Sequence, residues 1–399
     1  MVAGNVCEYG QAVKRALVLL TAASLVLPWS GAGVAAGAHL PAVCDGTWKR
    51  PTALPSLSRR GSTYNDIVAV TTRDVWVVGG SILDNRRVPR PGAVALRWDG
   101  LGWTRTPTPS GGSGDSALLE SVDATSRSDV WAIGKRYVRR LEGWYAYAIH
   151  WNGATWTMAN LPLVRVSRDD SRERITVAGP HDVWATADRN VTLHLSGSGW
   201  QKIRRQKPRQ RLWDISSASP RSVWALASFP SGRALLEHWN GRHWELHAHR
   251  RVPAGSAGNQ EIDRGAIAVD SDSQFMVVGQ SYNAHLEDDI ASSLSAHGET
   301  WGLRPVPIEP YGTVLNEVSD VAWQSRSTAW AVGDWPWTGS YGAEGAYGFI
   351  DRWNGHRWTT SWYSGSDHTY FVAVSSAERM TWALGGSTEG GGYFIERHC

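Results

Sequence analysis

The sequence predicts an all-β fold, a single seven-bladed β-propeller of four-stranded blades. Two short phrases alternate along the chain, and both are rich in tryptophan, which accounts for 24 of the 399 residues. The final copy of the second phrase is missing after the last copy of the first and stands at the front of the chain instead. Repetition of two phrases indicates blades, and the displaced copy indicates a ring closed by joining both ends of the chain.

The first phrase marks the second strand of each expected blade. It recurs every 40 to 55 residues, which is the period of four-stranded propeller blades. Its copies are Asp74-Val75-Trp76, Asp129-Val130-Trp131, Asp182-Val183-Trp184, Ser222-Val223-Trp224, Phe275-Met276, Thr328-Ala329-Trp330 and Met380-Thr381-Trp382. Tryptophans of the repeats are interpreted as core.

The second phrase marks the hairpin between the third and fourth strands. Asn-Gly and Asp-Gly between β-rich runs favour a two-residue type I′ turn, in which both residues have positive φ. Its copies start at Trp98-Asp99-Gly100, Trp151-Asn152-Gly153, Ser196-Gly197, Trp239-Asn240-Gly241, His297-Gly298 and Trp353-Asn354-Gly355, and the displaced copy is Asp45-Gly46-Thr47-Trp48.

Ring closure follows from the two ends of the chain. The tail from Tyr393 to His398 matches the third strand of the preceding unit, so the chain stops one strand short. We expect blade 7 to be shared by residues 45–56 and 369–399, which hides the sheet edges. In this register Cys44 and Cys399 come together, and an even pair of cysteines in an exported protein normally forms a disulfide.

The first 38 residues are typical of a signal peptide. Lys14 and Arg15 precede the apolar run 16–27, and a stretch of small residues, 31–38, follows as the cleavage zone. We therefore expect residues 39–399 to form the propeller, secreted to the extracellular space or the cell wall, with no membrane span. The competing interpretation is a lipoprotein anchor at Cys44, although Pro41 and Val43 do not fit a lipobox.

The repeats resemble those of secreted β-propeller proteins from actinobacteria, which are built from Val-Trp-Ala-Val-Gly and His-Trp-Asn-Gly-x-x-Trp units. The resemblance covers essentially everything after Cys44. It implies the propeller fold and export, and it implies no activity.

Aromatic residues outside the repeats are the candidate ligand-binding residues. They fall in long connections between the second and third strands, at 134–145 of blade 2 and 333–348 of blade 6. Variable loops on a rigid scaffold often carry function, and exposed rings can stack on sugars. The alternative is that these loops bury their own rings. The candidates are Trp144, Tyr145, Tyr147, Trp335, Trp337, Tyr341 and Tyr347.

Four acids start inner strands near the expected channel mouth: Asp66, Glu120, Asp214 and Glu317. Paired carboxyls could supply general acid and base groups, and a carboxylate ring could bind Ca²⁺. The alternative is that these acids accept backbone N–H groups and strengthen the ring. Zinc-type His and Cys spacing is absent from the sequence, and we expect no metal and no cofactor.

Basic residues gather in blades 1 to 3, whereas the net charge of +3 is too balanced to indicate nucleic-acid binding. Such a sector could attract an anionic cell-wall polymer, or it could simply be a solvated surface. Its members are Arg86, Arg87, Arg90, Lys135, Arg136, Arg139, Arg140, Arg204, Arg205, Lys207, Arg209 and Arg211.

The functional hypothesis is a monomeric, non-enzymatic recognition module that binds an extracellular glycan or protein through variable loops on one propeller face. The alternative is a carbohydrate-active hydrolase or lyase that uses the channel-mouth carboxylates. Inner acids all bonded to backbone would favour the binder, and two free carboxyls in an open cleft would favour the enzyme.

Overall fold

The computed structural model describes most of the chain after Val43. The described residues are 44–50, 54–55, 62–81, 92–109, 116–168, 172–188, 190–203, 211–228, 234–247, 262–283, 288–297, 300–305, 317–338, 344–363, 368–388 and 392–399. Residues Cys44–Cys399 form one compact unit. The signal peptide predicted at 1–38 lies outside the described residues, so it stays a prediction.

Antiparallel β-sheet dominates the described residues. An eight-stranded sheet contains two groups of four strands, joined by the single pair Gly80↔Leu118. The first group is β1 (Ser62–Thr71), β2 (Asp74–Ser81), β3 (Val94–Trp98) and β4 (Trp103–Thr106). The second is β5 (Ala117–Ser126), β6 (Asp129–Val138), β7 (Gly143–Trp151) and β8 (Trp156–Met158).

Four sheets of four strands and one of three follow, each a meander in chain order. The next two are β9 (Arg174–Gly179), β10 (Asp182–Ala187), β11 (Val191–Ser196) and β12 (Gly199–Ile203), then β13 (Arg211–Ser219), β14 (Ser222–Ser228), β15 (Ala234–Trp239) and β16 (Trp244–His247). After them come β17 (Ile262–Ser271), β18 (Gln274–Asn283), β19 (Asp288–His297) and β20 (Thr300–Pro305). The last strands are β21 (Glu317–Ser325), β22 (Thr328–Thr338), β23 (Glu344–Trp353) and β24 (Trp358–Tyr363), then β25 (Thr369–Ala377), β26 (Met380–Ser387) and β27 (Tyr393–His398).

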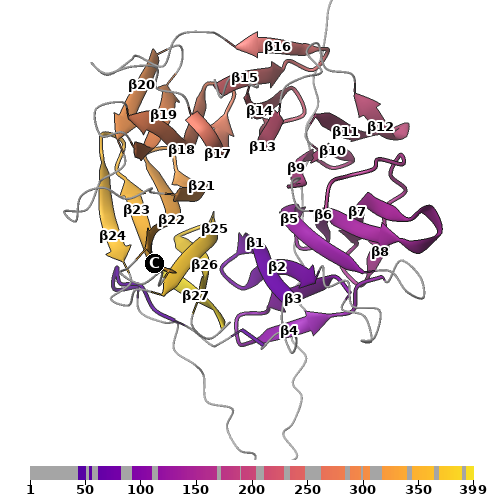
Figure 1. The fold of residues 1–399 in the computed structure, drawn as a ribbon, viewed down its shortest axis with the longest axis horizontal. Coiled ribbons are helices and arrows are strands. Elements are labelled where there is room, and N and C mark those ends of the chain that lie inside the picture. The colour runs from indigo at the N-terminus through magenta and orange to yellow at the C-terminus, as the bar shows by residue number, and fades with distance from the viewer. Residues whose placement is uncertain are drawn as a thin grey trace, which may run out of the picture. The chain divides into compact units, whose positions relative to one another are not determined.

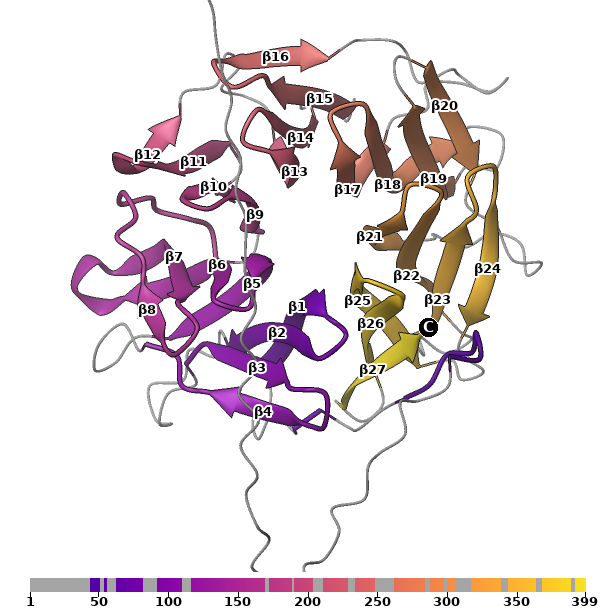
Figure 2. The same ribbon diagram turned by 180° about the vertical axis from the view of Figure 1, so that it is seen from behind.

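The sheets stand around a central space like the blades of a propeller (Figures 1 and 2). The first strand of each group lies innermost, and we call these the inner strands: β1, β5, β9, β13, β17, β21 and β25. The indoles of the Val-Trp phrase are fully buried at Trp76, Trp184, Trp330 and Trp382. The all-β prediction and the core role of these tryptophans are confirmed.

Turns after the third strands differ from the expected type. At Asn152-Gly153, only the glycine has positive φ, 95°. The Asn152 side-chain oxygen accepts the backbone N–H groups of Ala154 and Thr155, each at 3.0 Å. Because Trp151 pairs with Trp156 across the turn, the loop has four residues, and the two-residue type I′ prediction is wrong. The asparagine serves through its side chain, as in other Asx turns.

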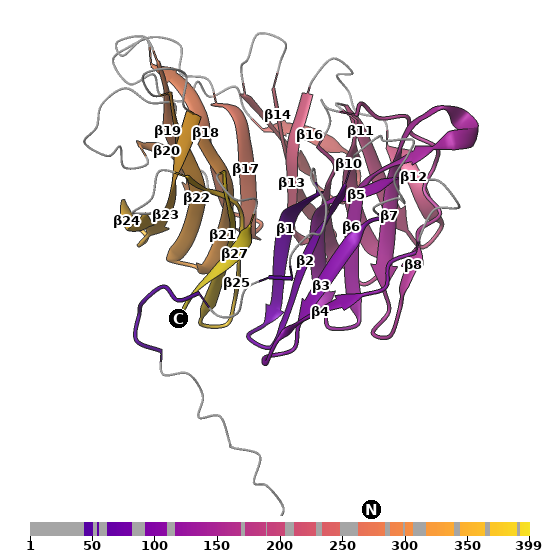
Figure 3. The ribbon, with the colours of Figure 1, turned by 60° about the horizontal axis from the view of Figure 1, so that its bottom comes forward.

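Three connections between second and third strands are long paired hairpins. Strand pairing reaches Val138↔Gly143, Asn283↔Asp288 and Thr338↔Glu344. In the first hairpin a 3₁₀ turn, η1 (Arg139–Leu141), forms the tip. Figure 3 shows this tip and the upper ends of β18 and β19 on the same side of the propeller. We call this side the hairpin face. In the segments 134–145 and 333–348, which the sequence predicts as long connections between second and third strands, most of the described residues are strand.

The two ends of the propeller unit meet beside β27. Cys44 and Cys399 form a disulfide with their Cα atoms 5.1 Å apart. Lys49 and Arg397 exchange two backbone hydrogen bonds of 2.8 Å, and Gly46 donates its N–H to the Cys399 carbonyl at 3.1 Å. The Trp48 ring packs edge-on against Trp330 with centroids 5.2 Å apart. The start of this unit therefore adds to the outer edge of its last sheet.

Candidate functional site

A bulge in the inner strands sets the site. In β1, β5, β13 and β21 the register with the second strand shifts by one residue, which leaves an extra residue unpaired. Bulges re-aim the side chains around them. We call the next residue the ring position, and in these strands it is Asp66, Ser121, Asp214 and Asp320.

Side chains at the ring position bond to the neighbouring inner strand. Along most of its length, each inner strand pairs with another strand on one side only. The N–H groups that point to its other side therefore need acceptors from elsewhere. Each ring-position oxygen supplies one. The donors are Val122 N–H to Asp66 Oδ2 (2.9 Å), Ile175 N–H to Ser121 Oγ (3.3 Å), Ile267 N–H to Asp214 Oδ2 (2.8 Å) and Val374 N–H to Asp320 Oδ2 (2.8 Å).

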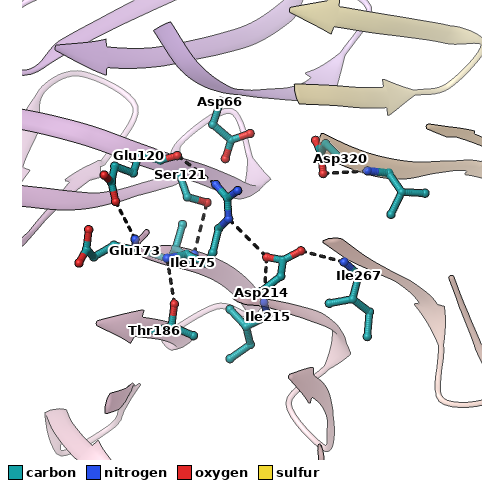
Figure 4. Close-up of polar contacts among 12 residues, drawn as sticks. Asp66, Glu120, Ser121, Glu173, Ile175, Thr186, Asp214, Ile215, Ile267 and Asp320 are labelled. Atoms are coloured by element: carbon teal, nitrogen blue, oxygen red, sulfur yellow. Dashed lines mark hydrogen bonds and ion pairs between the residues drawn. The ribbon is translucent and has the colours of Figure 1, made fainter. Parts of the chain in front are cut away.

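The second oxygen of each ring aspartate is also used. Oδ1 accepts the N–H of the following residue at 2.8 to 2.9 Å in Asp66, Asp214 and Asp320. Figure 4 shows Asp214 held in this way between Ile215 and Ile267. Both oxygens of these carboxylates therefore serve the backbone.

Two residues further along, a second level of contacts repeats the pattern. Asp123 Oδ2 accepts Val177 N–H at 2.7 Å, and Ser216 Oγ accepts Val269 N–H at 3.1 Å. Ser375 Oγ accepts Ala69 N–H at 3.0 Å, which links β25 to β1. Neighbouring sheets are thus joined by side-chain to backbone hydrogen bonds, including the last sheet to the first.

Arg174 occupies the matching place in β9 and brings a positive charge among the aspartates. Its Nε lies 3.7 Å from Asp214 Oδ1, and its guanidinium donates to the Glu120 carbonyl at 3.3 Å. Burial would lower the pKa of Arg174, but attraction by Asp214, Asp66, Asp320 and Glu120 outweighs it and raises that pKa. This arginine is the counterion of the ring.

Burial raises the pKa of the inner acids, because it disfavours their charged form. The pKa of Asp214 rises to about 6, and so does that of Asp123. Burial likewise raises the pKa of Asp66, and burial with repulsion from Asp66 raises that of Asp320 well above its ordinary value. The three ring aspartates, Asp66, Asp214 and Asp320, outnumber their counterion Arg174. Protonation of one of these carboxylates lowers the repulsion between them.

Glu120 belongs to a separate buried network. As the bulged residue of β5, it turns away from the ring. Its Oε1 lies 3.0 Å from Lys135 Nζ, and its Oε2 accepts the N–H of Glu173 at 2.7 Å. Lys135 Nζ also donates to the Arg168 carbonyl at 2.9 Å and lies 3.9 Å from Glu173 Oε2. This network ties β5 and β6 to the connection that leads into β9.

Glu317 is exposed at the start of β21 and lies away from the ring position, three residues before Asp320. It pairs in register with Asp334 of β22 at the base of the blade-6 hairpin. Burial first, and the Glu317 charge second, raise the pKa of Asp334 to about 7. The prediction that four acids form one ring is therefore corrected: the ring holds Asp66 and Asp214 and adds Asp320, which sequence reasoning missed.

A strand-by-strand alignment could have found Asp320. Asp66, Asp214 and Asp320 each lie ten residues before the tryptophan of the next Val-Trp phrase, Trp76, Trp224 and Trp330, whereas Glu317 lies thirteen residues before Trp330. Arg174 lies ten residues before Trp184 in the same way. The signal is an ionisable residue ten positions before this tryptophan.

The aromatic candidates of blade 2 lie in strand β7. Tyr147 is buried, and its hydroxyl donates to the Pro109 carbonyl at 2.6 Å. Tyr145 is also buried. Trp144 is half-buried and contacts Tyr137 with ring centroids 5.7 Å apart. Of the two interpretations, exposed rings and rings buried by their own connection, burial holds for both tyrosines, because strand pairing turns them into the core.

In blade 6, Tyr347 has an exposed side chain, at 36%. It lies in β23 and pairs with Trp335 of β22, while Trp337 pairs with Gly345. The side chains of Trp335 and Trp337, and all of Tyr341, lie outside the described residues. The described residues also bring together no three His, Cys, Asp or Glu side chains that could hold a metal ion.

No family model and no curated protein matches this chain. Two solved structures of similar fold are YCF48 from Cyanidioschyzon merolae and the Cps50 (Swd1) β-propeller domain of Myceliophteria thermophila. The first matches at 14% identity with a TM-score of 0.51 and covers 88% of this chain and 98% of its own. The second matches at 11% identity with a TM-score of 0.51 and covers 86% and 98%. These likenesses support a β-propeller fold and say nothing of activity.

A six-bladed fungal lectin from Aleuria aurantia matches more loosely. Its identity is 11% and its TM-score 0.41, over 78% of this chain and 98% of the lectin. Nothing about the ligand of this chain follows from so loose a match.

Proposed function

We propose that this protein is a secreted, monomeric recognition module that binds an extracellular glycan or protein on its hairpin face. In this proposal the eight-stranded sheet counts as two blades and the ring has seven, with residues 45–56 completing the last. The bond between Ala69 and Ser375 and the contacts around Cys44 support closure. The cysteine pair fits an oxidising compartment.

One observation favours binding over catalysis. The carboxylates of Asp66, Asp214 and Asp320 each accept two backbone N–H groups, one of them from the neighbouring inner strand. A general acid or base must be within reach of the proton that it transfers. Carboxylates that accept backbone N–H groups stabilise the fold. We therefore expect ligand binding on the hairpins that extend from the sheets.

Tyr347 is the described candidate contact on this face. An aromatic ring on a paired hairpin is held rigidly, so it loses little conformational entropy when it stacks on a sugar or a peptide. The backbone pairing of Trp335 with Tyr347 brings a second aromatic residue to the same place in the hairpin.

The test is a glycan array and a cell-wall pull-down with the protein, the Tyr347→Ala variant and the Trp335→Ala/Trp337→Ala variant. Binding that either variant loses supports a recognition site on blade 6. Binding that both variants retain moves the site elsewhere. Absence of binding by the unaltered protein contradicts the proposal.

A specific pair of carboxyls favours a second candidate, a carbohydrate-active hydrolase or lyase. Burial and the Glu317 charge raise the pKa of Asp334 to about 7, so about half of it is protonated at neutral pH, and its register partner Glu317 is exposed. A carboxyl with a raised pKa beside a second carboxyl is the pairing that acid-base cleavage of glycosidic bonds uses. Release of reducing sugar from a polysaccharide panel, abolished in both Glu317→Gln and Asp334→Asn, would favour this candidate.

A further inference from the structure

The face opposite the hairpins carries short turns of equal length. Each of the seven inner strands is joined to the second strand by two residues, since the strands pair up to the turn, from Thr71↔Asp74 in the first sheet to Ala377↔Met380 in the last. Figure 3 shows the β1–β2 and β5–β6 turns on the lower side of the molecule, away from the tip of the β6–β7 hairpin. We call this side the turn face. Turns of one length suit a flat partner.

Hydrogen bonds fix these turns to neighbouring sheets. Between the first two groups of strands, the Arg127 guanidinium donates to Thr71 Oγ1 at 3.3 Å. Between the last two sheets, the side-chain amide of Gln324 donates to the Arg379 carbonyl at 3.0 Å. The turns are therefore held in place around the central space, and they present their side chains from a rigid base.

Arginines stand in five of these seven turns. One of them, Arg127, has its Nε 3.6 Å from Asp74 Oδ2, so its charge is matched. We call the other four the turn arginines: Arg73, Arg221, Arg326 and Arg379. All four are exposed, and within the part of the chain that the structure describes none of their side chains forms an ion pair or a hydrogen bond. None of them belongs to the basic sector that the sequence indicates.

Carboxylates are fewer than arginines on the turn face. In the described turns the arginines are the four turn arginines with Arg127, Arg242 and Arg357, and the carboxylates are Asp99, Asp272 and Glu378. Asp45, beside them, forms its own pair with Lys49. Asp129 and Asp182, at the starts of β6 and β10, bond to tryptophan and histidine rings of their own sheets. Arginines outnumber carboxylates even when these two aspartates are counted, so the turn face keeps a positive excess.

A leucine protrudes from the same face beside one of the turn arginines. Leu101, in the turn between β3 and β4, is 74% exposed, more than any other large apolar side chain of the described residues. A Cβ atom added at its neighbour Gly100 would lie 2.9 Å from Arg73 Cγ, so the stem of Arg73 packs against this turn. An apolar side chain among basic residues is the combination that binds the interface of an anionic bilayer.

We infer that the turn face docks on an anionic lipid bilayer, with the turn arginines among the headgroup phosphates and Leu101 at the acyl boundary. Arg221, between β13 and β14, lies across the central space from Arg73, between β1 and β2 (Figure 1), so a flat surface meets both whereas one small anion does not. Arginine bonds phosphate oxygens in pairs. The inference goes beyond the proposed recognition role, because it uses the opposite face and leaves the hairpins pointing away from the membrane.

The test is co-sedimentation of the full chain with vesicles of phosphatidylcholine and phosphatidylglycerol in equal parts, measured above its binding to phosphatidylcholine alone. The test variant replaces all four turn arginines by glutamine. The control replaces four exposed arginines on the β6–β7 hairpin and the segment after β8, Arg139, Arg140, Arg165 and Arg168, and so removes the same charge. The test variant should bind roughly a hundredfold more weakly, since each arginine near an anionic surface contributes about fivefold. The control should bind as the unaltered protein does.

A second variant, Leu101→Ser, separates a bilayer from a dissolved polyanion. It should weaken binding to the anionic vesicles by about tenfold, because an apolar side chain no longer leaves water, and it should leave binding to poly(glycerol phosphate) unchanged. Vesicle binding that Leu101→Ser retains in full would overturn the inference in favour of general attraction to polyanions. No excess binding to the anionic vesicles, or equal weakening in both four-arginine variants, would also overturn it. Glycan binding on the hairpin face is unaffected by any of these outcomes.

Discussion

The inner strands and the hairpins of this protein use the same polar residue types in opposite ways. In the inner strands Asp66, Asp214 and Asp320 accept backbone N–H groups of the neighbouring inner strand, and Arg174 balances part of their charge. On the hairpins Arg140 and Arg165 are exposed, and so is Tyr347. Polar groups near the centre therefore maintain the ring, and those at the tips are available to meet a partner.

This difference shows why the obvious place for a site can mislead. Acids around the centre of a propeller resemble catalytic groups, but sheet edges there need acceptors, and the carboxylates provide them. Burial of these carboxylates raises their pKa, and repulsion between neighbouring acids adds to the rise. Substitutions in the ring should then change stability, and substitutions on the hairpins should change binding.

The largest expected effect is on the buried network of Glu120, Lys135 and Glu173. Lys135→Met leaves two carboxylates buried without their cation and should lower the free energy of unfolding by about 3–5 kcal/mol. The measurement is the denaturation midpoint in urea. The matched control is Lys49→Met, which removes an exposed pair with Asp45 and should leave the denaturation midpoint nearly unchanged. Equal decreases in the denaturation midpoint of both variants would show that the buried network stabilises the protein no more than the exposed pair does.

The next effect compares two acceptors on strand β13. Asp214→Ala removes the acceptor of two backbone N–H groups and a partner of Arg174, so it should cost about 2–3 kcal/mol. Ser216→Ala removes one neutral acceptor, that of Val269 N–H, and should cost about 1 kcal/mol. Thermal and urea unfolding measure both. A larger loss for Ser216→Ala would contradict the role given to the ring aspartates.

Stability should rise as the pH falls from neutral toward about 4. The folded pKa of Asp123 and Asp214 is about 6, above the value of 3.8 for the unfolded chain. The folded protein therefore holds more protons in this window, and each group lowers the free energy of unfolding by up to about 1.4 kcal/mol per unit of increasing pH. The melting temperature measured from pH 4 to pH 8 tests this.

One histidine works against this trend, so a variant is needed to isolate the aspartates. Burial lowers the pKa of His398, which makes the folded protein less stable as pH falls through about 6.5. Asp214→Asn keeps one acceptor oxygen and cannot ionise. Its stability should depend less on pH than that of the unaltered protein, and an unchanged slope would show that Asp214 is not responsible.

The smallest effect on stability should come from the hairpin tyrosine. Tyr347→Ala should change the free energy of unfolding by less than about 1 kcal/mol, because the ring is exposed. Tyr147→Ala, at a buried tyrosine of blade 2, should cost about 3–5 kcal/mol, since it leaves a cavity and an unpaired Pro109 carbonyl. Calorimetry separates the two. Only Tyr347→Ala should abolish glycan binding without loss of fold.

The arrangement of strands could be predicted from the sequence because the repeats are dense. Each Val-Trp phrase places one buried indole, and each Asn-Gly or Asp-Gly marks one hairpin, so errors in one unit are corrected by the others. Cys44 and Cys399 could be paired for the same reason, since the register of the last unit brings them together. Trp76 and Trp184 are as buried as the phrase predicts.

Site residues were harder to predict because single positions decide them. The bulge in β5 moves Glu120 out of the ring and Ser121 into it, and nothing in the local sequence marks a bulge of one residue. Tyr147 appeared to be a loop residue because strand β7 is longer than the repeat suggests.

The junction between Cys44 and Cys399 also determines the side from which the propeller unit can be tethered to a surface. Cys399 follows His398, which pairs with Thr381 next to the β25–β26 turn, whereas the hairpin face lies at the opposite end of these strands, beyond Ser387 and Tyr393. A tether attached at either Cys44 or Cys399 would therefore leave from the side away from the hairpins. On a surface, the hairpin face would point outward. A pulling force applied at Cys44 would pass through the disulfide to Cys399 and would not separate residues 44–50 from β27.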